Sequence, residues 1–467
     1  MTILSAETAD FEFTVPVLII GGGACGLTAA LAAREAGAEV LVLERDQKPT
    51  GSTSLSTGLI PAAGTRLQRE KGIEDSADIF AADLKAKARH QNDPGMADRI
   101  AEASGPTVDW LMETHGLMFR LVEGFLYPGH SRVRMHGTPS RTGAELQAGL
   151  LDAARRQGID VLGGAHVREL FADASGHIHG VRIHRGDGTT EQAGCGALVL
   201  ACNGFGGNPE MVKRNIPEMT EAPYHGHVGN QGEAVNWGLE LGAAVEDMGG
   251  YQGHGAVAHP QGLPVVWAVL TEGGFQVNGN GERFSNEVRG YSEQAVDVVN
   301  QPGQIAWNIY DQRCQAPALD FTEYRQLQDI GAVKSADTAA QLAAAIGVPS
   351  ETLEGTLTQV HDMARGRAED PFSRDFTIKP PLEPPFLAIR VTGALFHTQG
   401  GLVIDRQARV VRKDGGVLPN LFAGGGAARG LSGPSRWGYL SGNGLLTAIT
   451  LGRIAGREAA LMAVQRS

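Results

Sequence analysis

Three glycines and one glutamate near the start of the chain have the residue types and the spacing that hold a dinucleotide. Residues 15–20 form a short apolar run, which predicts a buried strand, and the glycines follow it directly. Gly21 allows a tight turn, Gly23 lets the backbone approach a pyrophosphate, and Gly26 lets the next helix pack on the strand. Glu44 ends a second apolar run 18 residues after Gly26 and can accept hydrogen bonds from both ribose hydroxyls. The pattern therefore predicts a bound NAD or FAD, the cofactors of hydride transfer.

The rest of the chain favours FAD over NAD. Residues 167–201 alternate between apolar runs and glycine turns, which predicts a β-meander that ends in the glycine-rich segment 203–207. A third strand at residues 421–423 runs into glycines 424–426, and a long helix follows from about residue 443 to 464. Three strands that end in glycines and converge on one nucleotide fit the longer FAD better.

Several further motifs are highly specific when taken together. They are Gly51 to Gly58 (GSTSLSTG), Ala62 to Thr65 (AAGT), Asn92 to Pro94, Val108 to Leu111, Arg141 to Gly143, Thr271-Glu272, Gly281 to Glu287 (GERFSNE), His397 to Gly401 (HTQGG) and Gly442-Asn443. In these motifs the sequence resembles the fumarate reductase/succinate dehydrogenase flavoprotein family, which also contains the 3-ketosteroid dehydrogenases. The resemblance implies a Rossmann-like (glutathione-reductase-type) α/β FAD-binding domain with an inserted α+β cap domain. It also implies hydride exchange between flavin N5 and a carbon next to a carbonyl or carboxylate.

The glycine turns and the resemblance together assign a set of residues to FAD. Respiratory members of the family tether the flavin to a histidine in the serine-rich segment, but residues 52–58 of this chain contain none. We therefore expect FAD to be bound non-covalently. The expected cofactor-binding residues are Gly21, Gly23, Ala24, Cys25, Gly26, Glu44, Arg45, Ser52, Thr53, Ser54, Gly58, Val167, Ala201, Asn203, Gly204, Glu233, Thr398, Gly425, Gly442, Asn443, Leu445 and Leu446.

Two tyrosines occupy positions where the dicarboxylate enzymes of the family have arginines. The family spacing Asn-Glu-x-x-x-Arg ends here in Tyr291, and the family motif Arg-Leu-Gly-Gly-Asn begins here with Tyr439. A guanidinium pairs with carboxylates and is a poor base, whereas a phenol can donate to a ketone oxygen and, when deprotonated, can remove a proton. The resemblance to the ketosteroid dehydrogenases then implies Tyr291 as the general base and Tyr439 as the donor that polarises a ketone.

Other residues are expected to complete the active site. By the resemblance, His397 touches the substrate and Tyr127 supports the tyrosine base. Arg436, together with the arginines of residues 127–136, could hold a carboxylate on the substrate. Glu272 matches an acid of the family's proton path, but the arginine that the family places three residues after it is missing.

The favoured hypothesis is an FAD-dependent dehydrogenase (desaturase) that introduces a C=C bond next to a ketone. Its substrate would be a cyclic ketone or an oxo-acid, similar to a 3-ketosteroid or 4-oxocyclohexanecarboxylate. The alternative is a fumarate-type reductase of an unsaturated acid, with Arg289 and Arg436 supplying the positive charge through local shifts. A carrier protein without turnover is the third hypothesis. The sequence contains no haem segment and no second flavin domain, so we expect an external electron acceptor.

The family pattern also predicts the domain organisation. The FAD-binding domain is expected to be split into residues 1–239 and 378–467. The cap domain over the substrate is expected at residues 240–377.

Composition limits the remaining possibilities. The 467 residues carry a net charge of −12, which argues against a nucleic-acid partner. Four widely spaced cysteines without a CxxC motif predict no metal site and a reducing, cytoplasmic location. We expect neither a secretory signal nor a transmembrane helix. The oligomeric state is left open.

Overall fold

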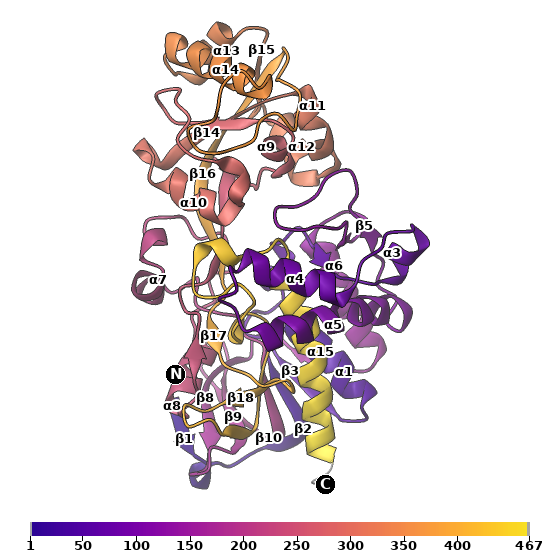
Figure 1. Cartoon of the computed structure of the whole chain (residues 1–467). Helices are drawn as coiled ribbons and strands as arrows, with labels where there is room; N and C mark the ends of the chain where they lie inside the picture. The colour runs from indigo at the N-terminus through magenta and orange to yellow at the C-terminus, as the bar shows by residue number, and fades with distance from the viewer. Residues whose placement is uncertain (1, 465–467) are drawn as a thin grey trace.

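A computed structural model describes residues 2–464, which form two lobes (Figure 1). The lower lobe in Figure 1 contains a nine-stranded sheet and both ends of the described chain, whereas the upper lobe contains a five-stranded sheet. The confirmed fold is therefore mixed α/β with a Rossmann-like sheet. Residues 1 and 465–467, at the ends of the predicted FAD-binding domain, lie outside the described residues.

The nine-stranded sheet is built around β2, which carries the first apolar run. Its main order is β1-β8-β9-β10-β2-β3-β7, and β19 pairs with both β10 and β18. Strand β2 runs parallel to β10 and β3, so it is covered on both faces and its residues Leu18 and Ile19 are fully buried. The strands are β1 (Thr2–Ser5), β2 (Phe13–Ile20), β3 (Val40–Leu43), β7 (Asp160–Leu162), β8 (His166–Ala172), β9 (Ile178–His184), β10 (Thr190–Leu200), β18 (Arg409–Val411) and β19 (Val417–Ala423).

Two helices that contact this sheet pack against each other at very short range. Helix α1 (Ala24–Glu35) packs along α15 (Asn443–Val464), the long C-terminal helix in yellow in Figure 1. A Cβ at Gly456 of α15 would lie 1.9 Å from the backbone oxygen of Ala29 in α1. Only glycine allows this approach, which brings the start of α15 beside the glycine turn after β2.

The second sheet has the order β12-β16-β14-β13, with β15 paired to β16. Its central strand, β16 (Phe386–Thr398), hydrogen-bonds to β12 at one end and to β14 at the other, and it ends at His397 and Thr398 in the lower lobe. The other elements of this lobe are β12 (Tyr251–Ala258), β13 (Phe275–Val277), β14 (Ile305–Asp311), β15 (Lys334–Ala336), α9 (Ala268–Thr271), α10 (Tyr291–Val299), α11 (Gln312–Gln315), α12 (Thr322–Asp329), α13 (Ala339–Ile346) and α14 (Ser350–Ala364). The predicted limits of the cap domain, residues 240 and 377, stay a prediction. Strand β16 begins after residue 377, yet it pairs with strands of the second sheet.

The remaining elements surround the junction of the two lobes. In the loop between β5 and β6, Phe125 and Tyr127 pack against the hydrophobic core of the upper lobe. These elements are α2 (Gly51–Ser54), β4 (Ile60–Pro61), α3 (Arg66–Glu70), α4 (Ala77–Lys87), α5 (Pro94–Glu113), β5 (Arg120–Leu121), β6 (Met135–Gly137), α6 (Gly143–Arg156), α7 (Pro209–Asn215), α8 (Glu233–Glu240), β11 (Val245–Glu246) and β17 (Gly401–Leu402), with 3-10 helices η1 (Ala6–Thr8), η2 (Pro217–Met219), η3 (Glu287–Arg289), η4 (Pro302–Gln304), η5 (Ala316–Asp320), η6 (Gly425–Ala427) and η7 (Arg436–Gly438). Within residues 2–464, no helix is both long and apolar enough to cross a membrane.

Candidate active site

The glycine turn after β2 forms a cradle that side chains would fill. Gly21 has a φ of +110°, and a Cβ there would lie 2.4 Å from the backbone oxygen of Ala201. A Cβ at Gly26 would lie 1.8 Å from the backbone oxygen of Gly21. Helix α1 starts at Ala24 without a side-chain cap, so its positive N-terminal end faces the turn. This geometry suits a pyrophosphate.

Glu44 is held rigidly at the end of β3. Its Oε2 accepts a hydrogen bond from the backbone N–H of Gly22 at 2.8 Å, and its Oε1 accepts one from the N–H of Asp46 at 2.9 Å. Each carboxylate oxygen keeps a further lone pair that can accept a ribose hydroxyl. The glycine cradle and this carboxylate fit the adenosine diphosphate half of FAD.

A single cavity runs from the glycine turn to the junction of the two lobes. Several expected residues do not line it, namely Gly26, Ser54, Gly58, Gly204, Thr398, Arg436, Asn443 and Leu446. The expected residues that do line it are Gly21, Gly23, Ala24, Cys25, Glu44, Arg45, Ser52, Thr53, Tyr127, Val167, Ala201, Asn203, Glu233, Tyr291, His397, Gly425, Tyr439, Gly442 and Leu445.

Asn443 lies just behind the cavity wall. Its neighbours Gly442 and Gly444 line the cavity, whereas its own side chain is fully buried at the start of α15. Neither its Oδ1 nor its Nδ2 has a hydrogen-bond partner. Buried amide groups are normally paired. Because the side chain does not face the cavity, the expected contact of Asn443 with the flavin stays a prediction.

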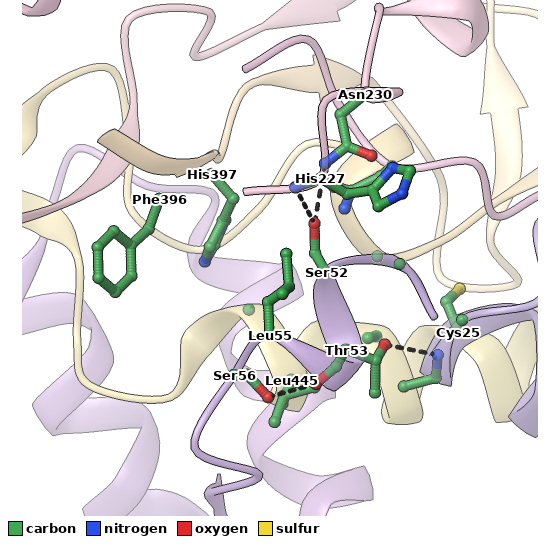
Figure 2. A pocket seen from close by; sticks show the side chains of 18 of the residues that line it. Cys25, Ser52, Thr53, Leu55, Ser56, His227, Asn230, Phe396, His397 and Leu445 are labelled. Atoms are coloured by element: carbon green, nitrogen blue, oxygen red, sulfur yellow. Dashed lines mark hydrogen bonds between the residues drawn. The ribbon is translucent and has the colours of Figure 1, made fainter. Parts of the chain in front are cut away.

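A loop that the sequence analysis missed, at residues 227–230, lines the cavity and contacts α2. Figure 2 shows the Ser52 hydroxyl accepting hydrogen bonds from the His227 backbone N–H at 3.3 Å and from Asn230 Nδ2 at 2.9 Å. Arg45 donates to the backbone oxygen of Gly229 in the same loop at 2.6 Å. Thr53 on α2 accepts from the backbone N–H of Ala24 at 2.9 Å (Figure 2). Helix α2 is therefore fixed between α1 and this loop along the cavity.

The two tyrosines expected to do chemistry come together at the other end of the cavity. Tyr291 starts α10 and Tyr439 follows η7, and their ring centroids are 6.0 Å apart. The ring of His397, at the end of β16, lies 5.5 Å from that of Tyr439. Tyr127, from the loop between β5 and β6, lines the same space. Three separate parts of the chain therefore bring phenol groups to one chamber.

His254 was not singled out in the sequence, but it forms part of the same chamber. Its ring stacks at 5.2 Å on the ring of Tyr291 and at 5.2 Å on that of Phe396, and Trp267 lies edge-on at 5.5 Å. His254 Nδ1 accepts the backbone N–H of Ala256 at 3.2 Å, which makes Nε2 the protonated nitrogen of the neutral ring. No local motif marks this residue, because only the pairing of β12 with β16 brings it to the chamber.

Burial keeps the two imidazoles of the aromatic chamber uncharged. It lowers the pKa of His254 to about 3 and that of His397 to about 4, so both imidazoles are uncharged at neutral pH. Burial and the neighbouring Tyr439 raise the pKa of Tyr291 well above its ordinary value, and a hydrogen bond with Ser441 acts in the opposite direction. Burial also raises the pKa of Tyr439, against the N–H groups of Gly444 and Gly442.

A buried ion-pair cluster holds the segment that leads into Tyr291. Glu287, from the Asn-Glu motif, pairs with Arg283 at 3.0 Å and with Arg374 at 2.9 Å, and it accepts the backbone N–H of Gln276 at 3.0 Å. Although burial alone raises it, the two guanidinium groups hold the pKa of Glu287 below its ordinary value. The motif therefore positions α10, and with it the phenol of Tyr291.

The arginines that were expected to hold a carboxylate are not in the chamber. Arg436 lies on η7 outside the cavity wall, and Arg134 is buried in ion pairs with Asp75 and Asp83. Arg289 is exposed, with its guanidinium 3.9 Å from a carboxylate oxygen of Asp297. Over the part of the chain that the structure describes, Arg45 at the nucleotide end is the one arginine in the cavity wall.

The expected proton-path acid is also outside the chamber. Glu272 pairs with Lys379 at 2.7 Å and is not part of the cavity wall. Its neighbour Thr271 faces a separate, smaller cavity. The family's dicarboxylate proton path is therefore not assembled here.

A nucleotide cradle that opens into an aromatic chamber defines an FAD-dependent oxidoreductase. The chain belongs to the FAD binding domain family, whose model matches residues 16–445. It is 30% identical to the probable fumarate reductase Ifc3 of Shewanella frigidimarina (strain NCIMB 400), over 99% of this chain and 78% of that protein.

Two solved structures extend the comparison. The open conformation of a flavocytochrome c3 fumarate reductase has a TM-score of 0.82 and 29% identity, covering 98% of this chain and 80% of that one. The 3-ketosteroid-Δ4-(5α)-dehydrogenase of Rhodococcus jostii RHA1, in complex with 4-androstene-3,17-dione, has a TM-score of 0.78 and 25% identity, covering 98% of this chain and 99% of that one. The chain is thus similar both to reductases of this family and to ketosteroid dehydrogenases.

Proposed function

We propose that this protein is a dehydrogenase that introduces a C=C bond next to the ketone of a cyclic substrate. The observation that carries the proposal is the pair of tyrosines whose rings lie 6.0 Å apart in a chamber to which residues 2–464 contribute no arginine. The similarity to the ketosteroid dehydrogenase supports the same assignment. FAD, bound along the glycine cradle, supplies the hydride acceptor at its N5 atom.

Tyr439 is suited to polarise the ketone. Its hydroxyl oxygen lies 3.5 Å from the backbone N–H of Gly444, which points out of the N-terminus of α15. Accepting this N–H makes the hydroxyl a better donor toward a ketone oxygen, and the raised pKa keeps it protonated. His397 packs beside Tyr439 and helps to keep the ring in place.

Tyr291 then acts on the carbon next to the ketone. Polarisation weakens the α C–H bond, and the proton passes to the phenolate oxygen of Tyr291 while its bonding electrons form the new C=C bond. The hydride leaves the β-carbon at the same time, so the substrate loses two electrons and two hydrogens. Tyr127 lines the same chamber. An external electron acceptor, in the cytoplasm as the sequence suggests, completes the proposed cycle.

The chamber favours an uncharged ketone over an oxo-acid. Among the described residues no guanidinium lines the chamber to pair with a carboxylate, and His254 and His397 are neutral. A carboxylate that entered this aromatic chamber would lose its hydration without gaining a cation. We therefore assign the carboxylated substrate a lower rank than a neutral cyclic ketone.

Anaerobic flavin reduction tests the proposal. Cyclohexanones or a 3-ketosteroid should bleach the yellow protein, and an artificial electron acceptor should restore the colour with formation of the enone. The Tyr291→Phe variant should bind the ketone but reduce its flavin far more slowly. Turnover that is unchanged in this variant would show that the base is a different residue.

The fumarate-type reductase is the second candidate function, supported by the relatives named as fumarate reductases. It requires cations at the reacting end of the cavity, which Arg289 and Arg436 would have to supply by moving. Protein reduced with dithionite and mixed with fumarate separates the two functions. Rapid reoxidation by fumarate, with none by an enone, would favour the reductase.

A further inference from the structure

Glu323 is an acidic residue in the cavity wall to which the proposed reaction gives no role. It lies in the first turn of α12, on a different element from the tyrosines of α10 and of the segment after η7. The neighbouring wall is apolar and includes Phe321, Val265 and Trp267. Glu323 therefore brings a carboxyl group to the wall of the same cavity.

One oxygen of the Glu323 carboxyl group has no partner among the described residues. Its Oε2 is buried without a hydrogen-bond partner. Burial raises the pKa of this carboxyl, against the weaker effects of a hydrogen bond from the Glu323 backbone N–H and of Arg325. Arg325 itself donates to the backbone oxygen of Leu319 at 2.7 Å and to Thr322 Oγ1 at 3.1 Å. A buried acceptor without a partner is costly, so a ligand that supplies a donor would be stabilised there.

The helix dipole stabilises an acid in the first turn of a helix, but it does not explain why Glu323 lies in the cavity wall. Glu351 in the first turn of α14 has the same helix position and is exposed. In α12 the helix rotation is set by the fully buried Tyr324, whose hydroxyl lies 2.6 Å from that of Tyr310 and accepts from Gln315 at 3.2 Å. This anchoring keeps the adjacent Glu323 in the cavity wall.

The nearby cation Arg141 is already engaged. Its guanidinium pairs with Asp320 at 3.3 Å and lies 5.1 Å from the ring centre of Phe321. These contacts tie the turn before α12 to the lower lobe. The charge of Arg141 is therefore paired with Asp320 and not with Glu323.

We propose that Glu323 recognises a hydroxyl group on the substrate, at a position away from the reacting ketone, by accepting its hydrogen bond. The inference rests on the proposed function, because it identifies the substrate class as hydroxylated cyclic ketones. A substrate carboxylate at the same place would meet a second acid and would be disfavoured.

Matched ketones test this recognition through the rate of anaerobic flavin reduction. The probes are 4-(hydroxymethyl)cyclohexanone, its near-isostere 4-ethylcyclohexanone, and 4-oxocyclohexanecarboxylate. The wild-type protein should prefer the hydroxymethyl ketone over the ethyl ketone by about tenfold or more in the second-order rate constant of reduction, the effect of one hydrogen bond to a buried acceptor that otherwise lacks a partner. The carboxylate should react the most slowly.

Variants assign the preference to the residue. Glu323→Leu should abolish the preference for the hydroxyl, while Glu323→Gln, which keeps an acceptor oxygen, should retain part of it. Glu351→Leu changes the matched helix position outside the cavity and should leave the preference intact. Equal rates for the hydroxymethyl and ethyl ketones in the wild type, a preference that survives Glu323→Leu, or fastest reduction by the carboxylate would each overturn the inference. Failure of every ketone to reduce the wild-type flavin would overturn the proposed function itself, and the inference with it.

Discussion

Replacing Tyr439 by phenylalanine removes one oxygen atom from the chamber and little else. The aromatic ring keeps its packing 6.0 Å from Tyr291 and 5.5 Å from His397. The lost hydroxyl gives up one long hydrogen bond, 3.5 Å from the backbone N–H of Gly444. A bond of this length is weak, so the free energy of unfolding should fall by less than about 1 kcal/mol.

The effect of the same change on catalysis should be much larger. If the hydroxyl stabilises negative charge that develops on the ketone oxygen, its loss should cost about 2.7–4 kcal/mol of transition-state stabilisation, or a roughly 100- to 1000-fold lower kcat. Steady-state assays with an artificial electron acceptor measure this loss. A thermal melt of the same preparation measures the stability.

Tyr310→Phe is the matched control for Tyr439→Phe. Tyr310 is fully buried outside the cavity wall, with its hydroxyl 2.6 Å from that of Tyr324. The control should lose about 1–2 kcal/mol of stability, because it breaks a short buried hydrogen bond, yet keep its kcat for a ketone without the hydroxyl group that Glu323 is proposed to bind. The reasoning is refuted if Tyr439→Phe keeps kcat within threefold of wild type, or if both variants lose activity in proportion to their stability.

Burial and a neighbouring phenol raise the pKa of Tyr291, so its phenolate fraction is small at neutral pH and grows through the alkaline range. The wild-type kcat/KM should therefore rise from neutral to alkaline pH, and a flat profile would contradict the assignment of the base. Glu287→Gln leaves two buried guanidinium groups without their carboxylate and should cost about 3–5 kcal/mol in denaturant unfolding. Since the folded pKa of Glu287 is lowered, its contribution to stability is present above the ordinary glutamate pKa and is lost as pH falls through the lowered value, so the wild-type Tm should drop in acid more than that of the variant. Gly26→Ala places a Cβ 1.8 Å from backbone and should yield protein without the flavin absorbance, whereas Gly355→Ala, with open space around it, should purify yellow.

The nucleotide half of the site was accessible from the sequence because its signals are local. The order of strand, glycine turn, helix, strand and acid lies within residues 13–44, and the structure reproduces it in β2, α1 and β3. Backbone requirements such as the positive φ of Gly21 leave a direct trace in residue type. The FAD-binding fold could therefore be predicted before any contact was known.

The substrate half depends on contacts between distant segments. His254 reaches Tyr291 only because β12 pairs with β16, and the sequence around it carries no motif. Arg436 stands close to Tyr439 in the chain, yet η7 leaves it outside the cavity wall. Closeness along the chain was therefore a poor guide to closeness in this chamber.

By itself, the sequence determined the cofactor, the α/β fold and the two tyrosines in place of arginines, because each depends on residue types at fixed short spacings. Only the tertiary structure decided which charged side chains line the cavity. It buried Arg134 in ion pairs, kept Arg436 outside and placed Glu323 in the cavity wall. The physical reason is that charge in a buried chamber is set by the packing of α10, α12 and β16 against one another and against the lower lobe, which no local spacing encodes.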